Sequence, residues 1–173
     1  MKTELIRMER VAKSIEGDEA LHNINFNLYE GEILGLLGLN GSGKSTLAHL
    51  LSGDLVPDHG YIFIDNDVVS LQSTSKAKQL GIHYIGRKSK LVLGISIAEN
   101  LFVICDNRQG NWFINRKKIY SDTKHSLNQF APNLQPERLA GALSAREIIF
   151  VEIAKAVHEG ARVIMQPPQF ITS

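Results

Sequence analysis

Cysteine is almost absent from this sequence, which excludes a fold held together by disulfide bonds. Cys105 is the single cysteine, so no internal disulfide can form, and this usage suits a reducing compartment. Because Cys105 ends the apolar run that begins at Leu101, we expect it to be a small core residue and not a nucleophile. Long apolar runs are also lacking, since none approaches the roughly 20 residues that a membrane-spanning helix needs. The composition therefore indicates a globular chain without a membrane span.

An excess of charge of either sign is lacking as well. The chain has 19 Lys and Arg against 18 Asp and Glu, giving a net charge of +1. No global field then attracts nucleic acid or an anionic membrane, and nucleic acid is not an expected partner. The basic cluster at 116–118 is interpreted as the start of a solvated helix. The six histidines lack metal-ligand spacing, and Asp65–Asp67 is predicted to be a hairpin turn and not a cation loop.

The strongest feature that is present is a glycine-rich stretch from Gly38 to Thr46. It follows the apolar run Ile33–Leu37, which predicts a buried strand, and precedes residues 47–51, which predict a helix. Glycines allow successive amides to point at one centre, and a helix start adds free amides and a positive dipole end. The pattern predicts a phosphate-binding loop, and a plain flexible loop is the alternative. The predicted nucleotide-binding residues of the loop are Gly38, Asn40, Gly41, Ser42, Gly43, Lys44, Ser45 and Thr46.

Two side chains of this loop carry the predicted chemistry. Lys44 is expected to lie against the β- and γ-phosphates of a nucleoside triphosphate, and the hydroxyl of Ser45 to bind Mg²⁺. The sequence therefore predicts a protein that binds a nucleoside triphosphate or descends from one that did.

Around the loop, the pattern predicts strands first and helices later. Strands are expected at 5–8, 24–28, 61–64, 82–85 and 162–165. Ser96 and Ser144 are each followed three residues later by glutamate, which predicts two capping boxes at helix starts. A helix capped by Asn115 is expected to run to about Phe130. The chain thus reads as mixed α/β.

The order of these motifs resembles the ATP-binding subunit of ABC transporters, and among them the ribose/galactose-type sugar importers. The matching phrases are residues 21–28, 31–38, 97–102 and 151–156. The resemblance implies an α/β P-loop core of the ABC type, with an antiparallel β-layer and an inserted helical subdomain. It also implies ATP and Mg²⁺ as cofactors and a second ABC-type ATP-binding subunit and membrane permease subunits as partners. The implied location is cytoplasmic, peripheral on the inner face of the cell membrane.

On this resemblance we expect a single, incomplete ABC-type nucleotide-binding domain over 1–173. Its predicted parts are a β-layer and P-loop half at 1–87, a helical subdomain at 88–142, and a signature-like helix with a return strand at 143–173. The family pattern stops after Met165, which favours a truncated reading frame that lacks the last core strands.

Several positions depart from the family pattern. Ile15 falls where the family carries an aromatic residue against adenine, so it is expected to bind the base without stacking. Arg87 replaces the glutamine that contacts Mg²⁺ and water, and an arginine cannot ligate a metal. Arg87 is expected either to pair with a phosphate oxygen or to point into solvent.

The signature phrase and the catalytic carboxylates also depart from the family. The phrase Leu-Ser-Gly-Gly-Gln stands here as residues 143–147, in which Arg146 adds bulk and Glu147 a negative charge. Residues 166–173 contain no carboxylate, so Mg²⁺ is expected to be weakly held, by Ser45 alone, and no catalytic residue is assigned.

Three functions stay open from the sequence. The chain is an active ATPase with unrecognised carboxylates, a non-hydrolysing subunit that pairs with an intact ATPase, or a truncated non-functional product. The sugar cannot be named, because specificity in this family belongs to the permease and binding protein.

Overall fold

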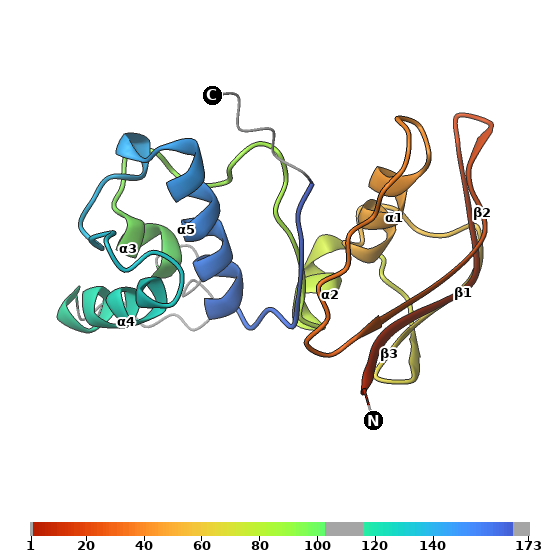
Figure 1. Cartoon of the computed structure of the whole chain (residues 1–173), viewed down its shortest axis with the longest axis horizontal. Coiled ribbons are helices and arrows are strands. Elements are labelled where there is room, and N and C mark those ends of the chain that lie inside the picture. The colour runs from red at the N-terminus through yellow and green to blue at the C-terminus, as the bar shows by residue number, and fades with distance from the viewer. Residues whose placement is uncertain (1, 103–115, 168–173) are drawn as a thin grey trace. The chain divides into compact units, whose positions relative to one another are not determined.

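The computed structural model describes residues 2–102 and 116–167 and divides the chain into two compact units, 1–82 and 83–173 (Figure 1). In the first unit the elements are β1 (Glu4–Ile15), β2 (Asp18–Tyr29), α1 (Lys44–Leu51), β3 (His59–Ile64), β4 (Asp67–Val69) and α2 (Thr74–Gln79). They are followed by β5 (Ile82–Tyr84), α3 (Ile97–Phe102), α4 (Arg116–Asn128), a 3₁₀ turn (Ala140–Ala142), α5 (Ala145–His158) and β6 (Val163–Met165). The expected α/β class is confirmed, whereas the predicted three-part division remains a prediction.

The first unit is built on a four-stranded antiparallel sheet in the order β2-β1-β3-β4 (Figure 1). The central strand β1 places Ile6 opposite Leu28 of β2 on one side and Ile64 of β3 on the other. The tight turn between β3 and β4 uses Asp65 and Asn66 at φ 52° and 69°, as a two-residue hairpin requires. This confirms both the antiparallel β-layer and the hairpin turn predicted at Asp65–Asp67.

Helix α1 supplies the apolar side chains that complete this unit. Leu47, Leu50 and Leu51 are buried along it, and the helix contacts β2. The helix ends before Gly53, which has φ 75° and lies against the backbone of Ser73. The predicted helix is therefore confirmed.

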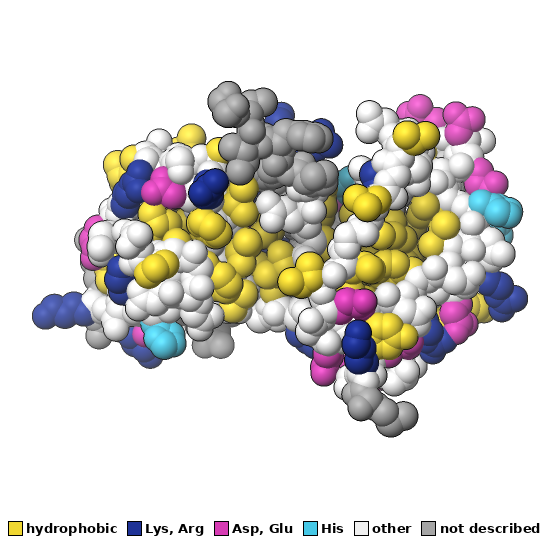
Figure 2. Space-filling model, in the orientation of Figure 1, with side chains coloured by type: hydrophobic (Ala, Val, Ile, Leu, Met, Phe, Trp, Pro, Cys, Tyr) yellow, Lys and Arg dark blue, Asp and Glu magenta, His cyan; other side chains and the backbone are white. Residues whose placement is uncertain are grey.

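The predicted strand at Ile33–Leu37 is wrong. These residues belong to neither sheet, and Ile33 and Leu37 are 100% and 96% exposed. Figure 2 shows hydrophobic side chains gathered on one face of the first unit. An apolar run becomes a buried strand only when neighbouring strands supply its backbone hydrogen bonds, and in the described ranges none pairs with this segment.

The second unit packs its helices around a separate apolar core. Its buried members come from α3, α4, α5 and the segments before and between them: Leu91, Ile97, Leu101, Leu127, Leu134, Ala140, Val151 and Ala154. Asn100 is fully buried and fixes the segment before α3, because its side chain bonds both the amide and the carbonyl of Val92. β5 pairs with β6 in a two-stranded sheet.

The predicted helix starts in this unit agree with the structure where residues are described. The Ser96 hydroxyl accepts from the Glu99 amide at 3.1 Å, and the Glu99 carboxylate accepts from the Ser96 amide at 2.8 Å. The predicted cap Asn115 and the predicted core residue Cys105 lie outside the described residues. None of the helices that the structure describes has the length and apolar character needed to cross a membrane.

Candidate phosphate-binding site

The glycine-rich loop and the start of α1 form one structure in the first unit. Gly41 and Gly43 have φ of 84° and 81°, which lets the loop curl before the helix begins at Lys44. Gly43 is the N-cap and has no side chain to bond the first helical amides. Within the described residues, no acceptor contacts the amides of Lys44 and Ser45. The loop thus presents free donors at the positive end of a helix, as phosphate binding requires.

The ammonium of Lys44 lies inside the curve of the loop. Its Nζ donates to the carbonyl oxygens of Gly38 at 2.8 Å and Leu39 at 2.7 Å, and to the hydroxyl of Ser42 at 3.0 Å. These bonds hold the two ends of the loop around one positive charge. A cation among free amides is a suitable contact for a polyphosphate.

Gly43 also joins the loop to the sheet. A Cβ at this position would lie 2.5 Å from Leu21 Cδ2 and 2.6 Å from the carbonyl oxygen of Ala20, both in β2. Ile15, the predicted base contact, ends β1 in the same hairpin, where it pairs with Asp18. Its side chain is 41% exposed and apolar, and Figure 1 shows the hairpin turn and the loop at the same end of the unit. The structure therefore brings Ile15 and the loop to one end of the unit.

The remaining predicted residues differ in how accessible they are. Gly38, Asn40, Gly41, Ser42 and Ser45 are exposed, and Gly43 and Lys44 are half-buried. Thr46 lies in the first turn of α1 and is buried, with 8% of its surface exposed. The exposed Ser45 hydroxyl, at the helix start, is free to contact a cation.

The described residues fit ATP better than they fit Mg²⁺. Free amides and the Lys44 ammonium match a polyphosphate. For Mg²⁺, Ser45 offers one oxygen, and no group of three or more His, Cys, Asp or Glu in the described ranges is placed to hold a metal ion.

The signature-like phrase lies in the second unit, at the start of α5. Ser144 and Glu147 form the predicted capping box, with the Ser144 amide 2.7 Å from the Glu147 carboxylate. Glu147 also accepts from Arg138 at 2.5 Å, and Arg138 donates to the carbonyl of Ala142. Hydrogen bonds from the Ser144 amide, the Ser144 side chain and then Arg138 lower the pKa of Glu147. The Glu147 carboxylate is thus held by the capping box. The sequence pattern does not identify Arg138 as its partner, because Arg138 lies nine residues before Glu147 in the chain.

The other departures also fall in the second unit. Arg87 follows β5 and lines a pocket against α5, and its guanidinium has no hydrogen-bond or ionic partner among the described residues. β6 ends at Met165, where the family carboxylates were expected, and the residues from 168 onward lie outside the described part. These residues belong to the second compact unit, and the phosphate loop belongs to the first.

A glycine loop that curls around a lysine at a helix start defines a P-loop protein. A family model described as ABC transporter matches residues 21–166, and the chain belongs to this family. Two solved structures show the same fold. A nucleotide-free ATP-binding cassette from an ABC transporter has a TM-score of 0.81 and 23% identity, covering 98% of this chain and 71% of that one. The ADP conformation of an ATP-binding cassette of an ABC transporter has a TM-score of 0.79 and 23% identity, covering 93% of this chain and 67% of that one.

Curated relatives come from sugar import systems. A putative ribose/galactose/methyl galactoside import ATP-binding protein of Agrobacterium fabrum is 35% identical over 93% of this chain. The ribose import ATP-binding proteins RbsA of Clostridium perfringens and RbsA 2 of Streptomyces coelicolor are 35% and 36% identical over 95% and 98% of it. The chain spans about a third of the length of these relatives, 32% of the first and 33% of the other two.

Proposed function

We propose that this chain is an ATP-binding subunit of an ABC-type sugar importer. The observation that carries the proposal is the phosphate loop, in which the Lys44 ammonium and the free amides at the start of α1 converge. The relatives from sugar import systems support the transport role. ATP is bound through Gly38 to Thr46, with Ile15 as an apolar contact for the base.

The proposed partners follow from the same family membership. A second ABC-type ATP-binding subunit completes the nucleotide site, and membrane permease subunits hold the chain on the cytoplasmic, inner face of the membrane. A bound Mg²⁺ supplies charge neutralisation on the phosphates, and here it is held weakly, through Ser45. Nucleic acid is not a proposed partner, because a net charge of +1 gives no general attraction for it.

ATP titration of the wild-type chain and of Lys44→Ala tests the proposal. Charge-assisted hydrogen bonds contribute about 1.5–3 kcal/mol each, so Lys44→Ala should weaken ATP binding roughly 10-fold to 150-fold. Lys76→Ala is the matched control, because Lys76 is an exposed lysine of α2 in the same unit. Equal ATP affinities in calorimetry for wild type and Lys44→Ala would show that the site is wrongly assigned.

A second candidate is a non-hydrolysing subunit that pairs with an intact ATPase. It is favoured by Arg87 at the glutamine position, Arg146 in the signature phrase, and the lack of a carboxylate in residues 166–173. In this form the chain binds ATP through the same loop but depends on its partner for turnover.

A further inference from the structure

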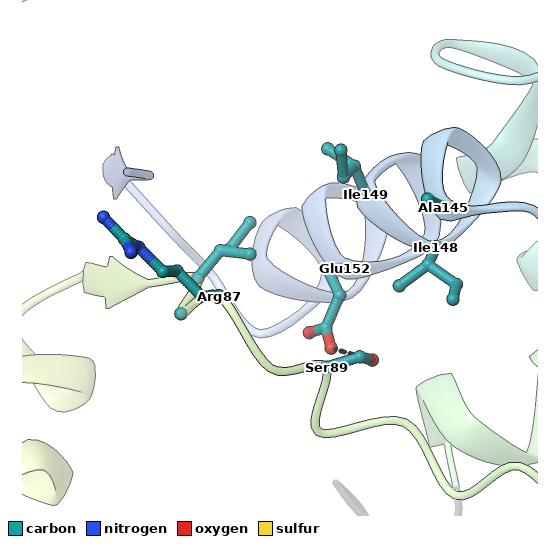
Figure 3. Close-up of a pocket in the computed structure, with 8 residues that line it drawn as sticks. Arg87, Ser89, Ala145, Ile148, Ile149 and Glu152 are labelled. Atoms are coloured by element: carbon teal, nitrogen blue, oxygen red, sulfur yellow. Dashed lines mark hydrogen bonds between the residues drawn. The ribbon is translucent and has the colours of Figure 1, made fainter. Parts of the chain in front are cut away.

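A pocket of about 140 Å³ lies within the second unit, between α5 and the segment that follows β5 (Figure 3). Its lining comes from two stretches of chain: Ile85, Gly86, Arg87 and Ser89 on one side, and Ala145, Ile148, Ile149 and Glu152 on the other. The pocket uses none of the phosphate-loop residues, so a ligand bound here does not occupy the phosphate loop.

The helix contributes one continuous stripe to this pocket. Ala145, Ile148, Ile149 and Glu152 are spaced at i, i+3, i+4 and i+7, which places them on one face of α5. Three of the four are aliphatic, and Ile85 adds a fourth aliphatic side chain from the opposite side. The walls are therefore mostly apolar, with a carboxylate at the end of the stripe.

The carboxylate of Glu152 is fixed through one of its oxygens. Its Oε1 accepts from the Ser89 hydroxyl at 2.7 Å and from the Lys90 amide at 2.8 Å. Its Oε2 has no hydrogen-bond partner among the residues that the structure describes. Figure 3 shows the Glu152 carboxylate beside Ser89 and the Arg87 guanidinium directed away from α5. The second oxygen is thus oriented by the first and is free to accept a hydrogen bond from a ligand.

We propose that this pocket binds the side chain of a lysine from a partner polypeptide. Four methylenes of a lysine would cover the isoleucine walls while the ammonium donates to Glu152 Oε2, as amphipathic side chains do at apolar surfaces. A metal ion needs more ligands than one carboxylate supplies. The pocket therefore favours an organic cation over a metal ion. An exposed ion pair contributes little alone, so a free amine would bind weakly and the contact gains importance within a larger interface.

The pocket can be probed with the lysine side chain in isolation. In chain labelled with ¹³C at the isoleucine methyls, n-butylammonium should shift the Ile85, Ile148 and Ile149 signals saturably. It should bind roughly 2-fold to 5-fold tighter than 1-butanol, which has the same stem without the charge. Equal affinity for the two probes, or no saturable shift, would overturn the proposal.

Variants separate the charge from the shape of the pocket. Glu152→Gln keeps an oxygen for Ser89 and the Lys90 amide but loses the charge, so the preference for n-butylammonium over 1-butanol should vanish. Ile149→Trp should fill the pocket and abolish the shifts of the other two isoleucines. Arg87→Gln, which removes a like charge from the lining, should leave binding equal or tighter. A preference that survives in Glu152→Gln would overturn the assignment of the carboxylate.

A second pair of probes tests whether the source is a polypeptide. A blocked five-residue peptide with a central lysine between alanines should produce the same isoleucine shifts as n-butylammonium. Its Nε-acetyl-lysine form, which has no charge, should bind roughly 2-fold to 5-fold more weakly. Shifts with n-butylammonium and none with the lysine peptide would show that the pocket admits a free amine only, and the polypeptide part of the proposal would be wrong.

Discussion

Gly43 satisfies two constraints at once, a left-handed backbone and a contact that leaves no room for a Cβ. Its φ is 81°, and a Cβ would lie 2.6 Å from the carbonyl oxygen of Ala20. Gly41 has a similar φ of 84° but nothing within 4 Å of an added Cβ. Comparing substitutions at the two glycines therefore separates the cost of backbone strain from the cost of a close contact.

Gly43→Ala should destabilise the first unit more than Gly41→Ala. Left-handed backbone costs a residue with a Cβ about 1–2 kcal/mol, and both variants bear this cost. Gly43→Ala must in addition displace β2, which should raise the total loss to about 2–4 kcal/mol. Urea unfolding of the two variants measures the difference. Equal losses would show that the contact between Gly43 and Ala20 does not contribute.

The ion pair of Asp58 should make the stability of the first unit depend on pH. The Lys13 ammonium at 2.6 Å and then the Ser14 amide at 2.7 Å lower the pKa of Asp58 from its ordinary 3.8. A carboxyl whose folded pKa is below its unfolded pKa stabilises the fold above the unfolded value, and this contribution is lost as pH falls through the folded value. Asp58→Asn should therefore be less stable than wild type at about pH 7, with the difference shrinking below about pH 4.

Urea midpoints of wild type and Asp58→Asn across this pH range measure the effect. Asp18→Asn is a suitable control, because Asp18 is exposed and its carboxylate has no hydrogen-bond or ionic partner within residues 2–102 and 116–167. A stability difference for Asp58→Asn that stays constant with pH would contradict the role of its charge.

At the scale of single residues, the sequence predicts those features that depend only on residues close together in the chain. The curled loop and Lys44 follow from one local glycine pattern. The contact of Gly43 with Leu21 and the pairing of Arg138 with Glu147 join residues that are distant in the chain, so no local pattern contains them.

At the scale of elements, α5 depends on its first turn. The Ser144 hydroxyl accepts from the Glu147 amide at 3.3 Å, and the Glu147 carboxylate accepts from the Ser144 amide at 2.7 Å. Ser144→Ala should cost about 1 kcal/mol of unfolding free energy, because one helical amide loses its acceptor. Ser144→Thr keeps an acceptor oxygen and should retain most of the stability. Denaturant unfolding followed by circular dichroism compares the three proteins, and equal stability of Ser144→Ala and wild type would refute the contribution of the cap.

The strand predicted at Ile33–Leu37 shows where element prediction fails. Its hydrophobicity is that of a strand buried on both faces, but the segment is exposed and unpaired in the structure. Helices form their own hydrogen bonds within one segment, and α1, α3 and α5 agree with prediction for that reason. A strand needs partners from elsewhere in the chain, and apolar periodicity alone does not identify them.

At the scale of the whole molecule, the phosphate loop and the positions where the family pattern places its catalytic groups belong to different compact units. The loop belongs to residues 1–82, whereas Arg87, Arg146 and Gln166 belong to 83–173. Phosphoryl transfer to water needs a positioned nucleophile and neutralised transition-state charge, and each contribution is commonly worth a hundredfold or more in rate. Binding of ATP can therefore survive in a chain in which turnover does not.

The isolated chain is expected to hydrolyse ATP near the uncatalysed rate. Arg87 cannot act as a base or ligate a metal, Arg146 crowds the signature phrase, and residues 166–173 supply no carboxylate. Steady-state phosphate release from the purified chain measures turnover, and Lys44→Ala is the control for contaminating ATPases. Adding a family member with intact carboxylates should raise the rate, because that partner supplies the missing groups at one composite site. Turnover of about one per second by the isolated chain, lost in Lys44→Ala, would instead establish an active ATPase with carboxylates that the sequence pattern does not identify.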